Sequence, residues 1–149
     1  MRYTSGKIKH TGDRSMSREK VRKIVEDAGY CQMATVVDGQ PRVRPMKFVV
    51  TDDFKFWCST VNVSGKVKEL QQDGRVELCW VDSQRNHLRV TGVADITGGT
   101  EKKRELLRLH PGALGLFDDE NDPSLVHVEV VPTRVRWKVH SFGEYNEVV

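Results

Sequence analysis

The chain has 149 residues, of which 38% are hydrophobic and 30% are charged, and its formal net charge is +3 at pH 7. This length and composition indicate one folded domain, and no apolar run approaches the roughly 20 residues that a membrane-spanning helix requires. The three cysteines, Cys31, Cys58 and Cys79, lack paired spacing, which argues against a disulfide framework or a metal site.

Residues 1–16 come first and are polar and basic, so they predict a disordered tail and not a secretory signal. We therefore expect a cytoplasmic protein. A helix is predicted from its N-cap, Ser17, to the residue before Gly29, which suits the position after a helix C-terminus. Its apolar residues recur at the spacing of one helix face: Val21, Ile24, Val25 and Ala28.

Strands dominate the remainder of the chain. They are predicted over residues 30–37, 40–51, 54–60, 76–81, 87–97, 125–131 and 134–141. Asp38 and Gly39 form a two-residue hairpin turn between the first two strands, and short helices begin at Ser64 and Thr100. Six or seven strands joined mostly by tight turns predict a mainly β protein, built as one antiparallel barrel domain over residues 17–149.

One face of the second predicted strand carries two cations. Arg42 and Arg44 share a parity, so their side chains point to the same side of the sheet. Pro45 donates no backbone N–H and belongs at an edge or a bulge, where neighbouring backbone groups can turn toward a ligand. Taken alone, the same residues also fit an edge strand that Arg and Pro protect against aggregation.

Hydroxyl groups and a lysine follow at the end of the next strand. Ser59 and Thr60 close that strand, and Ser64 and Lys66 open the helix after it. Hydroxyls, an ammonium group and a helix N-terminus are the groups that bind phosphate in proteins. Taken singly, Ser64 is an N-cap and Lys66 a surface lysine. Together with the Arg-bearing strand, they predict a site for a phosphorylated ligand.

Four segments occur in a characteristic order: residues 34–46 (ATVVDGQPRVRPM), 56–60 (FWCST), 64–70 (SGKVKEL) and 88–92 (LRVTG). In this order they resemble the pyridoxamine 5′-phosphate oxidase-like family of FMN-binding split barrels, and especially its small general-stress-protein-like members. The resemblance extends over residues 18–142. It implies a six-stranded antiparallel split β-barrel that forms a homodimer and binds FMN in grooves between the two subunits.

By position, the resemblance also implies which residues bind the cofactor. The flavin and its ribityl chain would lie along Arg44, Pro45 and Met46. The ribityl-phosphate would be held by Ser59, Thr60, Ser64 and Lys66. Near the flavin ring, the resemblance places a polar and an aromatic side chain, His87 and Trp137, with His87 coming from the other subunit. The sequence identifies no catalytic residue.

Two departures separate the chain from the true oxidases of this family. Those enzymes carry an Arg at the position of Gly65, which gives the phosphate a second cation. They also end in a strand whose Arg–x–His arrangement holds the phosphate of the substrate, and residues 137–149 lack it. The sequence therefore argues against oxidation of pyridoxamine phosphate itself.

The resulting hypothesis is an FMN-dependent oxidoreductase that acts on a small redox substrate of unknown identity. A non-enzymatic flavin-binding or flavin-sensing protein would use the same groove, and so would a relative that binds a deazaflavin or haem. A barrel that binds single-stranded nucleic acid would need aromatic platforms among its cations. Trp57, Trp80 and Trp137 are instead dispersed among apolar neighbours, which makes a nucleic-acid partner the weakest hypothesis.

Overall fold

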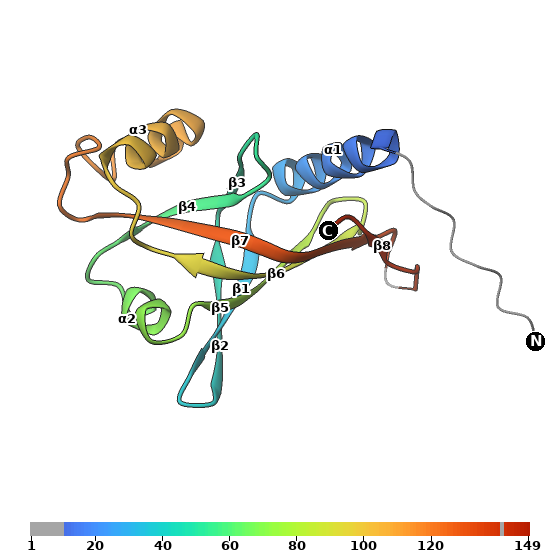
Figure 1. The fold of residues 1–149 in the computed structure, drawn as a ribbon, viewed down its shortest axis with the longest axis horizontal. Helices are drawn as coiled ribbons and strands as arrows, with labels where there is room; N and C mark the ends of the chain where they lie inside the picture. The colour runs from blue at the N-terminus through green and yellow to red at the C-terminus, as the bar shows by residue number, and fades with distance from the viewer. Residues whose placement is uncertain (1–10, 141) are drawn as a thin grey trace, which may run out of the picture.

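The computed structural model describes residues 11–140 and 142–149, which form one curved antiparallel sheet with helices around it (Figure 1). The helices are α1 (Thr11–Ala28), α2 (Gly65–Gln72), α3 (Thr100–Leu109) and the short 3₁₀ helix η1 (Pro111–Ala113). The strands are β1 (Cys31–Val37), β2 (Gln40–Met46), β3 (Val49–Val50), β4 (Phe56–Val61), β5 (Arg75–Val81), β6 (His87–Asp95), β7 (Leu125–Lys138) and β8 (Asn146–Glu147). The predicted class, mainly β and antiparallel, is confirmed, but the described sheet has eight strands and not six.

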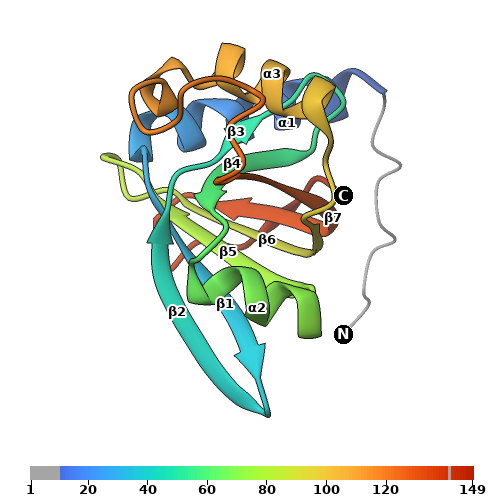
Figure 2. The same cartoon turned by 90° about the vertical axis from the view of Figure 1, so that its left-hand side faces the viewer.

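The sheet runs in the order β2-β1-β5-β6-β7-β4-β3, and β8 adds to β7. Its two edge strands, β2 and β3, are consecutive in the chain and only Lys47 and Phe48 lie between them. The two edges must therefore meet at these residues, which curls the sheet into a barrel that is open between its edges. Figure 2 shows α1, β3 and α3 together at one end of this barrel and α2 at the other.

The tight turn between β1 and β2 forms as predicted. Asp38 and Gly39 both have positive φ, 49° and 78°, as a primed two-residue turn requires. Each of the seven residues of β1 then pairs with a residue of β2, from Cys31 with Met46 to Val37 with Gln40. The prediction that β2 continues to residue 51 is wrong, because the chain leaves β2 after Met46 and pairs with β4 from Val49.

The last long strand departs from the prediction of two separate strands. β7 continues from residue 125 to 138 through Pro132, which lies between the two predicted strands, 125–131 and 134–141. The pairing of β6 with β7 shifts between Thr91 and Gly92, and this bulge accommodates the proline. A Cβ on Gly92 would lie 2.6 Å from the backbone oxygen of Val131, so the close approach at the bulge requires glycine.

Helix α1 begins earlier than predicted, at Thr11 and not near Ser17, so residues 11–16 are helical and not part of a disordered tail. The other predicted tail residues, 1–10, lie outside the described residues. The apolar face of the helix is buried as predicted, with Val21 and Ile24 fully inaccessible. None of the described helices combines the length and the apolar character needed to cross a membrane.

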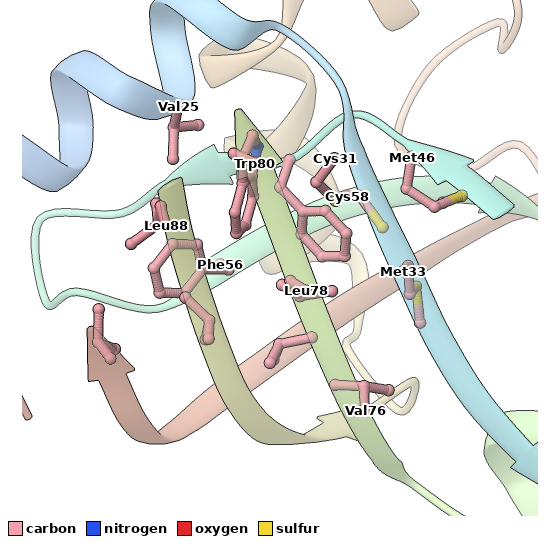
Figure 3. Close-up of a cluster of buried hydrophobic side chains, with 14 of the residues drawn as sticks. Val25, Cys31, Met33, Met46, Phe56, Cys58, Val76, Leu78, Trp80 and Leu88 are labelled. Atoms are coloured by element: carbon pink, nitrogen blue, oxygen red, sulfur yellow. The ribbon is translucent and has the colours of Figure 1, made fainter. Parts of the chain in front are cut away.

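The main core fills the inside of the barrel, where side chains of β1, β4, β5 and β6 meet α1 (Figure 3). Phe56 and Trp80 lie at its centre with ring centroids 5.7 Å apart, and neither is exposed. A second, smaller apolar cluster lies on the outer side of β7, where Leu125 packs with Leu107 of α3 and with Phe117. The cysteines are free thiols, and burial raises the pKa of Cys31 to about 12.

Candidate anion-binding site around helix α2

The junction of β4 and α2 gathers three of the predicted phosphate-binding side chains. The Lys66 ammonium donates hydrogen bonds to Thr60 Oγ1 at 3.1 Å and to Ser64 Oγ at 2.8 Å. In the part of the chain that the structure describes, no carboxylate lies within ion-pair distance of Lys66. Because its partners are neutral hydroxyls, the charge of Lys66 is not compensated, and all three groups can turn toward an anion.

The start of α2 adds to this positive region. Ser64 occupies the N-cap position, but its hydroxyl makes no capping bond to the backbone and accepts from Lys66 instead. The first turn of α2 carries no acidic side chain. The partial positive charge at the N-terminus of the helix is therefore free of a local counter-charge.

A second cation beside α2 is bonded differently. Arg44 of β2 donates through Nη2 to Thr35 Oγ1 at 2.9 Å and to Glu69 Oε2 at 2.5 Å. Thr35 also donates to the same carboxylate oxygen at 2.8 Å, and the Arg44 and Glu69 side chains are only 19% and 18% exposed. The other Arg44 nitrogen, Nη1, is buried and has no partner within the described structure. Arg44 therefore contributes its positive charge to this region, while the N–H groups of Nη1 are enclosed by the fold.

Lys66 and Glu69 lie three residues apart on α2, so they share one helix face. The hydroxyl groups bonded to Lys66 and the arginine bonded to Glu69 therefore lie along the same side of α2. The combined site contains two cations and one carboxylate. The two cations were predicted from the sequence, but Thr35 and Glu69 were not. The helical spacing from Lys66 to Glu69 could have placed Glu69 near the predicted site. The contact of Glu69 with Arg44 could not be predicted in this way, because it depends on how α2 packs against β1 and β2.

Three other predicted residues take different positions. Ser59 and Thr60 are neighbours on β4, so their side chains point to opposite faces. Thr60 faces Lys66, whereas Ser59 pairs with His127 on the side that α3 covers. Met46 is buried in the main core (Figure 3), and Pro45 is exposed. Of these three side chains, Ser59 therefore points away from the Lys66 cluster, and Met46 is enclosed in the core.

The two residues predicted near the flavin ring lie far from Lys66 within one chain. In the pairing with β7, Thr60 is opposite Val126, whereas His87 is opposite Lys138. These positions are separated by about 40 Å of strand, taking about 3.3 Å per residue. Trp137 is adjacent to Lys138 and lies near α1, with the Lys20 ammonium 5.3 Å from its ring centroid. A single chain cannot bring His87 or Trp137 to a ligand bound at Lys66.

A phosphate monoester fits the groups around α2. It would find the Lys66 ammonium, two hydroxyl groups, the uncapped start of a helix and the nearby positive charge of Arg44. Each charge-assisted hydrogen bond of this kind contributes about 1.5–3 kcal/mol. The Glu69 carboxylate lowers the net positive charge of the site, and it repels an anionic ligand.

Comparison with known proteins places the chain among related structures. It matches a Clostridium acetobutylicum protein of the NimC/NimA family with a TM-score of 0.73 and 21% identity, over 88% of this chain and 93% of that one. General Stress Protein 26 of Bacillus anthracis matches with a TM-score of 0.71 and 18% identity, over 88% and 98% of the two chains.

A heme binding protein from Mycobacterium smegmatis matches with a TM-score of 0.69 and 16% identity, over 88% of this chain and 57% of that one. The TM-scores establish a shared fold. A search of curated proteins found no match. The sequence profile of the family described as "Pyridoxamine 5'-phosphate oxidase" matches residues 17–138, so the chain belongs to this family.

Proposed function

We propose that the protein binds FMN and acts as a flavin-dependent oxidoreductase on a small-molecule substrate. The observation that carries this proposal is the Lys66–Thr60–Ser64 cluster, a cation bonded only to hydroxyl groups at the start of a helix. Membership of the pyridoxamine 5′-phosphate oxidase family supports FMN as the phosphorylated ligand. When bound, the flavin supplies the redox chemistry, because it can accept and return electrons or a hydride.

The residues around α2 would hold the cofactor by its phosphate. Lys66 and Arg44 would supply charge, Thr60 and Ser64 would supply hydroxyl donors, and the exposed Pro45 would border the ribityl chain. Because Ser59 turns its side chain away and the Met46 side chain is buried in the core, any contact from them would come from the backbone. These groups bind and orient the cofactor, and none of them is positioned as an acid or a base.

A second copy of the chain would complete the site. His87 and Trp137 lie at the far end of β7 from Lys66, so they can reach a flavin ring only from a partner subunit. Exposed apolar side chains lie in both parts of the proposed site, Val81 opposite His87 at 52% and Val43 next to Arg44 at 64%, and they are suited to burial in such an interface. We therefore propose a homodimer, whose mass sedimentation analysis would measure directly.

The substrate is proposed to differ from pyridoxamine phosphate. Gly65 provides no second cation at the start of α2, and β7 and β8 lack the Arg–x–His arrangement of the true oxidases. A flavin carrier or sensor would use the same phosphate site without a substrate. Reduction of the bound flavin by a nicotinamide donor, followed by reoxidation with an acceptor, would distinguish an enzyme from such a carrier.

The test is the visible absorption spectrum of the purified protein, with and without added FMN, after gel filtration. We expect flavin bands that remain with the wild-type protein. Removal of the ammonium in Lys66→Ala should weaken FMN binding about 10- to 100-fold, since one charge-assisted contact is lost. Lys68→Ala is the matched control, because Lys68 is an exposed lysine on the same helix. Equal FMN binding by both variants would contradict the assigned phosphate site.

Haem is the second candidate ligand, and the structural match to a heme binding protein favours it. A colourless protein that ignores FMN but develops a Soret band on addition of haem would support this alternative. Titration with a deazaflavin cofactor belongs in the same experiment, because its phosphate would meet the same residues around α2.

A further inference from the structure

A hollow of about 430 Å³ lies between α1, the segment that joins β2 to β3, and the C-terminal end of α3. Figure 2 shows these elements at the end of the barrel opposite α2. None of the residues that line the hollow belongs to the Lys66 cluster. Its volume falls within the range of small-molecule sites. Apolar side chains form much of its lining: Val25, Phe48, Val49, Val50 and Leu109.

The wall between α1 and β3 is fixed by an arginine. Arg22 donates through Nη1 to the Val50 carbonyl at 3.0 Å and through Nη2 to the Thr51 carbonyl at 2.8 Å. Phe48 is only 2% exposed and Val25 only 5%, so the floor is part of the packed core. The hollow is therefore preformed, and the guanidinium of Arg22 serves mainly to hold its wall.

Two opposite charges also line the hollow. Lys47 and Glu26 are exposed, which places them on its solvent side. Within the described residues, neither side chain makes a hydrogen bond or an ion pair, and they are not paired with each other. A ligand that carried both an anionic and a cationic group could therefore be recognised at both ends.

A third polar group faces the same space. His110, which follows α3, lines the hollow, and its Nδ1 atom is buried without a hydrogen-bond partner. Burial and the nearby Lys47 charge lower the pKa of His110, which favours the neutral imidazole at pH 7. A neutral imidazole nitrogen can accept a hydrogen bond from an ammonium group. The last carbonyls of α3 add partial negative charge on this side.

We propose that this hollow binds a small zwitterion of the amino-acid class with an apolar side chain. Lys47 pairs with its carboxylate, Glu26 and His110 receive its ammonium group, and Phe48, Val49 and Leu109 contact its side chain. This site goes beyond the proposed cofactor function and needs no bound flavin.

The experiment is a titration of the ¹⁵N-labelled full-length protein with L-phenylalanine, followed by backbone amide shifts, with and without FMN. We expect saturable shifts at residues that line the hollow, and none around α2. Two probes of the same shape that lack one charge, 3-phenylpropionate and phenethylamine, should each bind at least about tenfold more weakly. Non-saturable shifts, or equal binding of all three probes, would overturn the proposal.

Two charge-removing variants assign the contacts. Lys47→Gln and Glu26→Gln should each weaken L-phenylalanine binding about tenfold, since each removes one charged partner. The matched controls are Lys68→Gln on α2 and Glu19→Gln on α1, both exposed residues outside the hollow. Wild-type affinity in Lys47→Gln and Glu26→Gln would overturn the proposal, and the amide spectrum of each variant reports whether it is folded.

Discussion

The polar groups under α3 and those around α2 are bonded in opposite ways. Under α3, the Glu129 carboxylate is 5% exposed and accepts from Trp57 Nε1 at 2.8 Å and from the Lys102 ammonium at 3.2 Å. Around α2, the half-buried Lys66 ammonium bonds to hydroxyl groups and, among the described residues, to no carboxylate. The first region has its charge compensated, and the second has charge available for a ligand. Substitutions under α3 should therefore change stability, and substitutions around α2 should change ligand binding.

The largest effect is expected at Glu129. Glu129→Ala leaves the Trp57 indole N–H buried without an acceptor and removes the partner of Lys102. The unsatisfied buried N–H and the cavity left by the Glu129 side chain should together lower the free energy of unfolding by about 3–5 kcal/mol, as urea denaturation would measure. FMN affinity of the folded fraction should not change. A variant that loses FMN affinity but keeps its stability would contradict the division between the two regions.

The next effect is a pH dependence from His127, which is fully buried beside Trp57, with ring centroids 4.4 Å apart. Burial lowers its pKa to about 4, although the Glu129 charge opposes this shift. In the unfolded chain the imidazole takes up a proton near its ordinary pKa of about 6.5, so this group destabilises the fold increasingly as the pH falls from about 6.5 to 4. Below that range its contribution is constant.

The measurement is the free energy of unfolding as a function of pH for the wild type and His127→Leu. The loss in the wild type relative to the variant should reach on the order of 3 kcal/mol at pH 4. Parallel pH profiles for the two proteins would show that His127 does not titrate as its burial implies. Neither protein should differ in FMN affinity at pH 7, because His127 lies on the side of β4 away from Thr60.

Around α2, a gain in affinity is expected from Gly65→Arg. A Cβ at this position would meet no atom within 4 Å, and Gly65 is not among the residues with positive φ. The substitution should therefore be tolerated, and it adds a cation at the start of α2 beside Lys66. FMN should bind about tenfold more tightly, which corresponds to one charge-assisted contact. An unchanged dissociation constant in fluorescence titration would show that the phosphate lies elsewhere.

Local spacing was sufficient to predict much of this architecture. The Asp38–Gly39 turn, the buried face of α1 and the contact of Lys66 with Thr60 and Ser64 each depend on residues close in sequence. The contact between Arg44 and Glu69 joins elements that are distant in sequence, so no local pattern predicted it. The continuity of β7 through Pro132 was not predicted for the same reason, since the bulge that accommodates the proline is formed with β6.

The smallest change in FMN affinity is expected at Glu69, the carboxylate of the combined site, and it tests directly whether this region has charge available for a ligand. Glu69 accepts from both Arg44 and Thr35 and lies one turn from Lys66. Glu69→Gln keeps the shape and an acceptor oxygen but removes the negative charge, which frees the Arg44 guanidinium for phosphate. We expect FMN to bind about fivefold more tightly, since an interaction between charges that are partly exposed to solvent is worth up to about 1 kcal/mol.

Two comparisons make this test specific. Glu101→Gln removes an exposed carboxylate from α3 and should leave FMN affinity unchanged. In an Arg44→Ala background, the further substitution Glu69→Gln should leave FMN affinity the same as in Arg44→Ala alone, because the guanidinium that Glu69 releases is no longer present. A gain that persists without Arg44 would mean that Glu69 acts on the phosphate directly, through repulsion, and not by occupying Arg44. In either case Glu69 lowers the affinity of the α2 region for anions, whereas Glu129 stabilises the region under α3.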